Sequence, residues 1–230
     1  MNYRTLHDWN ITASEAIRLQ RELATQVREE PLSPDSIRLA AGSDMSFDGQ
    51  NSDPNAPVFA GFIVLDVPGF AVHERAGVQT TSPFPYIPGL LSFREVPPLL
   101  AAWEKLTVRP DVLLADGQGR AHPRRFGLAC HLGLVLDVPT IGVAKTLFVG
   151  THDPLPSAAG SWTPLRDKDE VIGAVVRTRA DVSPVYVSVG HRVDLPSAIE
   201  IVLRCTHKTR LPETSRLAHS FVNELRRNAS

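Results

Sequence analysis

Cysteine is scarce in this 230-residue chain, which has only Cys130 and Cys205, both inside apolar segments of helical spacing. Two thiols in such positions argue against a disulfide scaffold and indicate buried side chains in a reducing compartment. Long apolar runs are missing as well, because the longest, from about Val58 to Leu65, stops at Asp66 and is too short to cross a membrane. We therefore expect a cytoplasmic protein with no membrane association.

An excess of positive charge is also absent. The formal net charge is -1, which argues against a protein that coats DNA indiscriminately, because sequence-independent binding rests on many Lys and Arg contacts to phosphates. Any contact with nucleic acid must come from a local cluster. Arg120, Arg124 and Arg125 supply one around His122, and a solvated loop is an equally good interpretation of these residues taken alone.

The composition and length that are present suit one globular domain over residues 1–230. Hydrophobic residues make up 43% of the chain and charged residues 21%, which is ordinary for a folded domain. The first part predicts a helix over 12–29 and then three strands over 37–47, 58–67 and 70–79. Turn formers separate these strands, which indicates an antiparallel meander.

Helices and short strands alternate in the rest of the chain. The spacing predicts helices over 90–106, 124–136, 197–207 and 212–227, strands over 112–115, 140–144, 170–178 and 185–189, and an exposed loop over 150–169. Such an alternation indicates parallel neighbours. An antiparallel meander followed by this pattern is the order of a ribonuclease H-like fold, an α/β fold with a mixed central sheet flanked by helices.

Two aspartates interrupt the expected strands. Asp44 lies within the first strand, and Asp116 ends the strand over 112–115. A buried carboxylate is unfavourable unless it is paired or binds a metal, and α/β sheets bind ligands at the carboxyl ends of their strands. If the two strands are neighbours, the carboxylates converge and offer the hard oxygen ligands that Mg²⁺ prefers. Capping of a helix or turn remains the alternative for either aspartate alone.

A proline-rich loop precedes the next helix. Residues 83–89 read Pro-Phe-Pro-Tyr-Ile-Pro-Gly, so prolines stiffen the loop while Tyr86 projects from its middle, which suits a rigid wedge against stacked bases. An aromatic tucked against the core is the alternative. Glu95, at the start of the helix, is a third carboxylate, although taken alone it is more typical of a surface residue paired with Arg94 or Arg124.

Basic and imidazole groups complete the candidates. The segment His122-Pro123-Arg124-Arg125 enters a helix through a proline, so backbone N–H groups and two guanidinium groups would meet at a natural phosphate site. Lys145 follows the strand over 140–144, where an ammonium can stabilise phosphate charge, although an isolated lysine is usually just solvent-exposed. His219 lies on an amphipathic helix, where a core or surface histidine is the default. No His or Cys spacing predicts a zinc site.

Together these residues resemble the endonuclease V family over about 39–219. The matching blocks, in chain order, are Pro85-Tyr86-Ile87-Pro88-Gly89 with Phe93-Arg94-Glu95, Asp116-Gly117 with His122-Pro123-Arg124-Arg125, Gly142-Val143-Ala144-Lys145, and Gly190-His191-Arg192-Val193. Four blocks in the right order are far more specific than any one. The resemblance implies a DNA repair endonuclease that recognises deoxyinosine and hydrolyses the second phosphodiester bond 3′ to it, leaving 3′-hydroxyl and 5′-phosphate ends.

The resemblance also implies roles for individual residues. Asp44, Asp116 and Glu95 would hold Mg²⁺, with Mn²⁺ as a substitute. His219 would complete this environment, and Lys145 would face the scissile phosphate. The remaining roles are a strand-separating wedge of Pro85, Tyr86, Ile87 and Pro88, a base pocket of Gly89, Leu91, Gly117, Gly127 and Leu128, and phosphate contacts from His122, Arg124 and Arg125.

The chain departs from the family pattern in two places. Asp116-Gly117-Gln118-Gly119 stands where the family often has Asp-Gly-His-Gly, and Thr146-Leu147-Phe148 replaces the usual basic residues after Ala-Lys. The second departure is expected to weaken binding of the nucleic-acid backbone rather than the chemistry.

We expect a monomer, with inosine in RNA as an alternative substrate. A structure-specific nuclease for flaps or junctions and a non-catalytic binder of deaminated nucleic acid remain the alternative functions.

Overall fold

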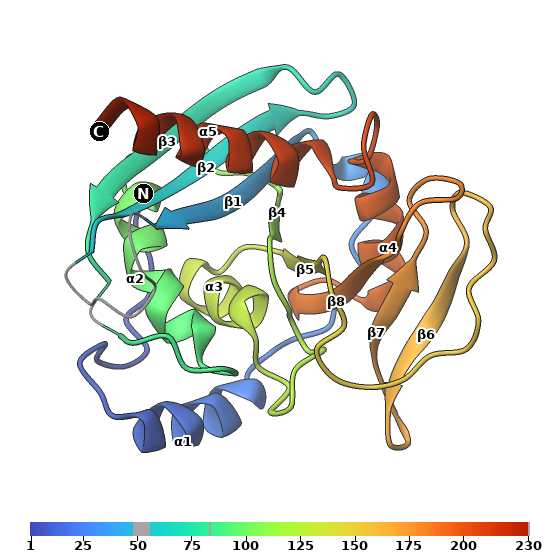
Figure 1. The fold of residues 1–230 in the computed structure, drawn as a ribbon, viewed down its shortest axis with the longest axis horizontal. Helices are drawn as coiled ribbons and strands as arrows, with labels where there is room; N and C mark the ends of the chain where they lie inside the picture. Colours follow the sequence, from blue (N-terminus) through green and yellow to red (C-terminus); the bar gives the residue numbers. More distant parts are fainter. Residues whose placement is uncertain (48–55, 83, 230) are drawn as a thin grey trace.

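The computed structural model describes residues 1–47, 56–82 and 84–229. Pro83 and the predicted turn over 51–55 lie outside the described residues. Figure 1 shows a single mixed sheet in the order β3-β2-β1-β4-β5-β8-β7-β6, with helices on both of its faces. No helix in these described ranges is long and apolar enough to cross a membrane.

The elements follow one another in the order that the sequence predicts. The first helix ends at Ala24 instead of residue 29, and two further differences are described below. The first half holds α1 (Ala13–Ala24), a short 3₁₀ helix (Pro34–Ser36), β1 (Leu39–Phe47), β2 (Val58–Asp66), β3 (Val72–Thr80), α2 (Leu91–Trp103) and β4 (Val112–Ala115). The second half holds α3 (Leu128–Leu136), β5 (Thr140–Ala144), β6 (Trp162–Asp167), β7 (Glu170–Val176), β8 (Val185–His191), α4 (Leu195–Arg204) and α5 (Glu213–Ala229).

Strand pairing confirms the predicted fold class. β1, β2 and β3 form the antiparallel meander, and β1 continues through parallel pairing into β4 and β5. β8, β7 and β6 then extend the sheet with antiparallel pairs. The result is an α/β fold whose parallel centre lies between two antiparallel ends.

The loop predicted over 150–169 is a correction, because it contains strand β6. β6 lies at the sheet edge, where β7 is its one neighbouring strand in the described sheet and Arg166 adds an isolated bridge to Thr151. An edge strand tolerates Pro164, since one side of its backbone needs no ladder partner. Proline, arginine and aspartate in so short a segment produce the composition of a loop, and the strand forms only because β7 offers it a partner.

The third helix is also shorter than predicted, beginning at Leu128 instead of residue 124. Arg125 has φ +55°, in the left-handed region that a right-handed helix cannot include. Gly127 then takes an extended conformation as the N-cap. Residues 122–127 therefore form an ordered turn ahead of the helix. Arg124 and Arg125 lie in this turn and not in the first turn of α3, where the sequence predicts them.

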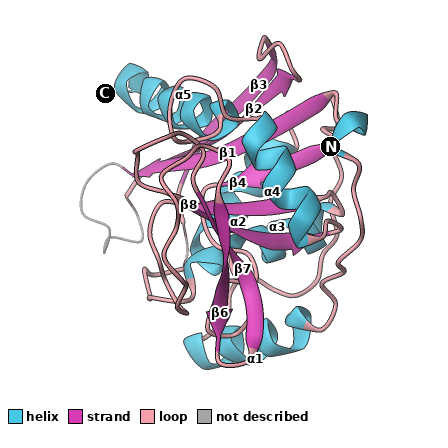
Figure 2. Cartoon of the chain, turned by 90° about the vertical axis from the view of Figure 1, so that its right-hand side faces the viewer, coloured by secondary structure: helices cyan, strands magenta, loops and turns pink. Residues whose placement is uncertain are grey.

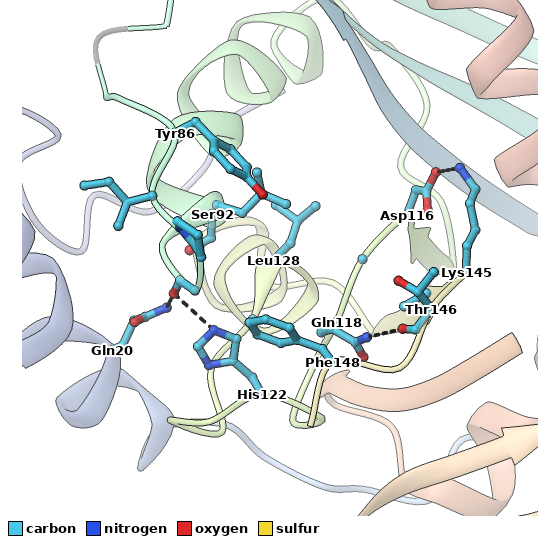
Figure 3. Close-up of a pocket in the computed structure, with 17 residues that line it drawn as sticks. Gln20, Tyr86, Ser92, Asp116, Gln118, His122, Leu128, Lys145, Thr146 and Phe148 are labelled. Carbon is cyan, nitrogen blue, oxygen red and sulfur yellow. Dashed lines mark hydrogen bonds and ion pairs between the residues drawn. The ribbon is translucent and has the colours of Figure 1, made fainter. Parts of the chain in front are cut away.

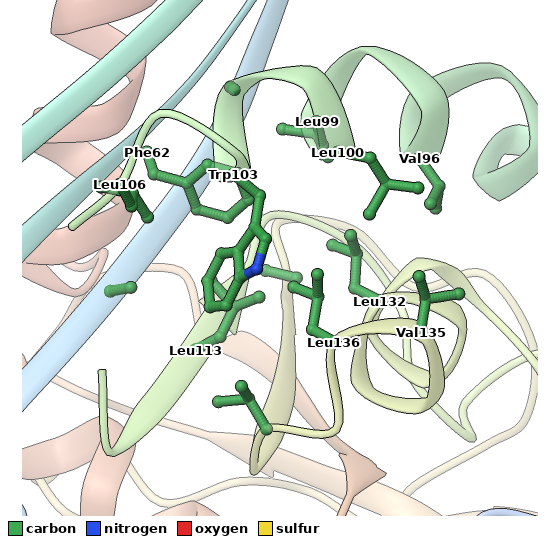
Figure 4. Packing of buried hydrophobic residues seen from close by; sticks show 14 of the residues in the cluster. Phe62, Val96, Leu99, Leu100, Trp103, Leu106, Leu113, Leu132, Val135 and Leu136 are labelled. Atoms are coloured by element: carbon green, nitrogen blue, oxygen red, sulfur yellow. The ribbon is translucent and has the colours of Figure 1, made fainter. Parts of the chain in front are cut away.

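Two apolar layers hold the sheet between helices. On one face, α2 and α3 pack against β1, β2 and β4, with Trp103 fully buried and its ring centroid 5.5 Å from that of Phe62 (Figure 4). On the other face, α4 packs against the middle strands, and α5 runs along β1 and β2 (Figure 2). Each large apolar side chain buried in this way contributes about 1.5–3 kcal/mol. These contacts fix β1, β4, α2 and α5 relative to one another.

Candidate functional site

Two of the predicted carboxylates lie on neighbouring strands, Asp44 within β1 and Asp116 directly after β4. The parallel register pairs Ser43 of β1 with Ala115 of β4, so Asp44 and Asp116 are the next residues along the two strands. Their side chains keep only 14% and 16% of their surface exposed. The expectation that the first strand adjoins the strand of Asp116 is confirmed by this pairing.

Glu95 joins this pair from α2. The pKa of Glu95 is raised to about 8, mainly by burial and then by the negative charges of Asp44 and Asp116. Burial likewise raises the pKa of Asp44, and Asp116 adds to that effect. Like charges held close together oppose ionisation, so the three carboxylates behave as one acidic cluster.

Two basic side chains contact the acidic cluster. His219 of α5 lies with Nδ1 2.7 Å from Oδ2 of Asp44, and its side chain is 60% exposed. Lys145, directly after β5, forms an ion pair with Asp116. The fold therefore brings together all five residues for which the sequence predicts a chemical role, from β1, α2, the ends of β4 and β5, and α5.

The acidic cluster has the donor chemistry of a site for a hard divalent cation. Among the residues that the structure describes, no three His, Cys, Asp or Glu side chains are grouped so as to enclose an ion as they stand. Lys145 instead forms an ion pair with Asp116, and His219 is hydrogen-bonded to Asp44. The residues still fit Mg²⁺, because carboxylate oxygens are its preferred ligands and a cation relieves the repulsion that raises the pKa values.

A pocket of about 350 Å³ opens beside Asp116 and Lys145 (Figure 3). Its walls come from the proline-rich loop, the start of α2, the turn after β4, the start of α3 and the segment after β5. All five predicted base-pocket residues line it, namely Gly89, Leu91, Gly117, Gly127 and Leu128. Its volume lies within the range of small-ligand sites, roughly 300–1,000 Å³.

Two helices direct their N-termini at this pocket. α2 begins at Leu91 and α3 at Leu128, both pocket residues, and neither helix has a side-chain cap. A helix N-terminus carries backbone N–H groups without intrahelical partners and a partial positive charge. The N–H groups of Phe93 and Ala129 already donate to the carbonyls of Leu90 and Gln118, so the donors that would suit a carbonyl oxygen on a ligand are the other N–H groups at the two helix starts.

Gly127 is required by the backbone around it. A Cβ at this position would lie 2.3 Å from the carbonyl oxygen and 2.7 Å from the carbonyl carbon of Gln118. The space that a side chain would fill is thus taken by the turn after β4, which forms the facing wall of the pocket. Contact with the neighbouring wall, and not with a bound base, is what keeps this residue small.

We expect Gly127→Ala to destabilise the protein by about 1–3 kcal/mol, because the Gln118 backbone must move. If the pocket takes the base that the family resemblance implies, cleavage at that base should fall more than nicking of undamaged strands, since the wall that moves belongs to the pocket. Chemical unfolding and nick mapping measure the two effects. Gly69→Ala is the matched control, because nothing lies within 4 Å of a Cβ there. Equal behaviour of the two variants would contradict this account.

The aromatic of the proline-rich loop projects outward. Tyr86 lines the rim of the pocket and is 53% exposed, whereas Phe84 in the same loop is buried against the core. The alternative in which Tyr86 tucks against the core is therefore wrong. A stiff loop with an exposed ring at the mouth of a pocket has the form of the predicted wedge.

His122 faces inward. Its Nδ1 accepts a hydrogen bond from the backbone N–H of Arg124 at 3.1 Å, so the ring proton is on Nε2, which donates to the carbonyl of Gly89 at 3.1 Å. Burial and the nearby Arg124 lower the pKa of His122 to about 4. The neutral ring is a wall of the pocket, and both of its nitrogens have protein partners instead of a phosphate.

The two arginines predicted to contact phosphate also have protein partners. Arg124 donates to the carbonyl of Gly89 at 2.7 Å. Arg125 donates to Glu170 at 2.7 Å and to Asp167 at 2.8 Å, which ties the turn before α3 to the β6–β7 hairpin. In this arrangement the cluster stabilises the pocket turn, which differs from the role that the sequence predicts.

Six residues that line the pocket have no role in the sequence prediction, namely Gln20, Ser92, Gln118, Ala144, Thr146 and Phe148. Phe148 is 46% exposed, and its ring centroid lies 5.5 Å from that of His122. The sequence signal for Phe148 was its place in the segment Thr146-Leu147-Phe148, where the family usually has basic residues. Gln20 is buried on the same face of α1 as Ala16 and Leu23. Its signal was a polar residue in an otherwise apolar stripe.

Comparisons with known proteins bear on this site as a whole. The family model of endonuclease V matches residues 21–220. An endonuclease V from Myxococcus xanthus is 53% identical over 219 residues, which cover 95% of this chain and 92% of that protein. The crystal structure of endonuclease V from Bacillus subtilis superposes with a TM-score of 0.93 at 31% identity, covering 100% of this chain and 98% of that one.

Two similar structures contain nucleic acid. One of them is a variant of endonuclease V from Ciona intestinalis, in complex with a 23-mer DNA that contains an inosine followed by a ribo-adenosine. The TM-score is 0.82 at 26% identity, and the match covers 96% of this chain and 100% of that one.

Proposed function

Because the chain belongs to the endonuclease V family, we propose that it is a Mg²⁺-dependent endonuclease that nicks DNA beside deoxyinosine. The observation that carries this proposal is the acidic cluster at the rim of the pocket, where Asp116 belongs to both. Catalytic carboxylates next to a pocket for one small planar group suit a nuclease that reads a single base. A flap or junction nuclease has no need of such a pocket.

Recognition requires the damaged base to leave the helical stack. Hypoxanthine differs from adenine by its 6-oxo group and N1 proton, and from guanine by the missing 2-amino group. The pocket walls at Gly89, Gly117 and Gly127 are backbone, so their donors and acceptors stand at fixed positions. Extruding the base into such a pocket makes these differences readable.

The proposed reaction hydrolyses the second phosphodiester bond 3′ to the lesion and leaves 3′-hydroxyl and 5′-phosphate ends. Asp44, Asp116 and Glu95 would hold Mg²⁺, or Mn²⁺ in its place, and the bound ion supplies Lewis-acid activation of water. Lys145 already lies at Asp116 and would stabilise the charge of the scissile phosphate. His219, hydrogen-bonded to Asp44 and exposed, would orient water at the phosphorus.

A nicking assay tests this proposal directly. Matched DNA strands with and without one inosine are incubated with Mg²⁺, with Mn²⁺ and with a chelator at fixed salt, because phosphate contacts are salt-sensitive. We expect metal-dependent nicks that concentrate one nucleotide beyond the lesion. Nicks spread evenly over both strands would rule out the inosine assignment. The same strand made as RNA shows whether inosine in RNA is also a substrate.

Tyr86→Ala should lower nicking of duplex DNA more than nicking of single strands. An exposed aromatic on a proline-stiffened loop can fill the space that an extruded base leaves, and unpaired bases need less separation. The loss of one base-stacking contact corresponds to about 1–3 kcal/mol, so about tenfold on duplex is expected. Initial rates on the two substrates measure the difference. A replacement at the exposed Tyr3 is the control, and equal losses on both substrates would assign Tyr86 a packing role.

A further inference from the structure

Gln20 is an amide buried between the two walls of the pocket. Its side chain is 1% exposed, although it lies on the apolar face of α1 with Ala16 and Leu23. Burying an amide is unfavourable unless its hydrogen bonds are made. The hydrogen-bond partners of Gln20 therefore explain why a polar side chain stands on the apolar face of α1.

The three partners of Gln20 come from both sides of the pocket. Nε2 donates to the carbonyl of Gly89 at 3.0 Å and to the carbonyl of Phe126 at 2.9 Å, while Oε1 accepts from Nε of Arg124. Gly89 ends the proline-rich loop, and Phe126 precedes Gly127 on the facing wall. Both N–H groups and the oxygen of the amide are thus used, which fixes its orientation.

The carbonyl of Gly89 is a shared anchor. It accepts hydrogen bonds from Gln20 and from Nε2 of His122 at 3.1 Å (Figure 3). A third comes from Nη2 of Arg124 at 2.7 Å. Gly89 has φ +80°, a conformation that side chains rarely adopt. Three donors on one carbonyl hold this residue, and with it the end of the loop that carries Tyr86.

We propose that Gln20 is a positioning residue that sets the width of the pocket by bridging the walls at Gly89 and Phe126. This inference rests on the proposed function, because the width decides which base is accepted. Gln20 contacts neither Asp44, Glu95 nor Asp116 in any hydrogen bond of the described residues. Loss of the bridge should therefore lower discrimination between bases and leave the hydrolytic groups in place.

The decisive variant is Gln20→Met, which keeps a similar volume and removes the hydrogen bonds. Two carbonyls lose a donor, and the loss of a buried hydrogen bond corresponds to a factor of about ten. We expect the ratio of affinities for an inosine strand and a matched adenosine strand to fall about tenfold, with kcat on the inosine strand less affected than KM. Gln26→Met, at an exposed position just after α1, should keep the wild-type ratio.

If Gln20 only fills space, methionine will pack equally well and the ratio will stay unchanged, which would overturn the inference. Circular dichroism and thermal unfolding show whether the variant folds. Should Gln20→Met not fold, Gln20→Asn provides the same test, because its shorter amide cannot reach both walls and must also lower the ratio; an unchanged ratio would again overturn the inference. A wild-type protein without any inosine preference would instead contradict the proposed function.

Discussion

Asp116→Asn is expected to lower the rate of nicking at inosine on the order of a thousandfold, which corresponds to roughly 4 kcal/mol of lost transition-state stabilisation. Asparagine has nearly the shape of aspartate but lacks the charge that holds a divalent cation. Binding of the inosine strand should change little, because Asp116 touches the pocket only at the rim where Lys145 also lies. Single-turnover cleavage and gel-shift affinity on one substrate measure the two quantities.

Asp153→Asn is the matched control, since Asp153 is exposed on the loop before β6 and should behave like the wild type. Asp44→Asn should show the same split as Asp116→Asn, because both carboxylates belong to one cluster. Turnover at the wild-type rate by the Asp116 variant would remove this residue from the metal site. Loss of affinity together with rate would show that the ion pair with Lys145 shapes the pocket instead.

Most of the sheet could be predicted because its signals are local. Alternating apolar residues with turn formers between them specify the meander of β1, β2 and β3, and the short apolar runs of β4 and β5 are typical of buried parallel strands. β6 could not be predicted, because an edge strand with Pro164 gains its stability from pairing with β7. That pairing lies in the fold and leaves little trace in the segment itself.

The acidic residues could be predicted for a similar reason. A carboxylate inside or directly after an apolar strand is unfavourable unless it is paired or binds a metal. Asp44 and Asp116 both stand in such positions. The inward turn of His122 and Arg125 could not be predicted, because it depends on Gly89 and on the β6–β7 hairpin. Residues with the composition of a phosphate site become the frame of a pocket when distant partners take up their donors.

Glu95→Gln is expected to remove much of the pH dependence of stability in the metal-free protein. Folding raises the pKa of Glu95 from 4.5 to about 8 through burial and the charges of Asp44 and Asp116. Below about pH 4.5 the carboxyl is protonated in both states, and its full contribution to stability is present. As the pH rises toward 8, the unfolded chain ionises while the folded protein keeps the proton, so stability is lost across this window.

The size of this effect follows from the same shift. Each unit of pKa difference corresponds to about 1.4 kcal/mol, so the wild type in a chelator should lose a few kcal/mol relative to Glu95→Gln between pH 5 and 8. Urea unfolding across this range measures the difference. Glu104→Gln, at the exposed end of α2, is the control and should follow the wild type.

Divalent cation should reverse this loss of stability. A carboxyl group must lose its proton before it can bind Mg²⁺. Binding therefore stabilises the folded protein most at the pH where the metal-free protein is least stable. We expect millimolar Mg²⁺ to raise the unfolding free energy of the wild type at pH 8 more than at pH 5, and to raise that of Glu95→Gln much less. Equal responses of both proteins to Mg²⁺ at pH 8 would exclude Glu95 from the cation site, while leaving Asp44 and Asp116 as its candidates.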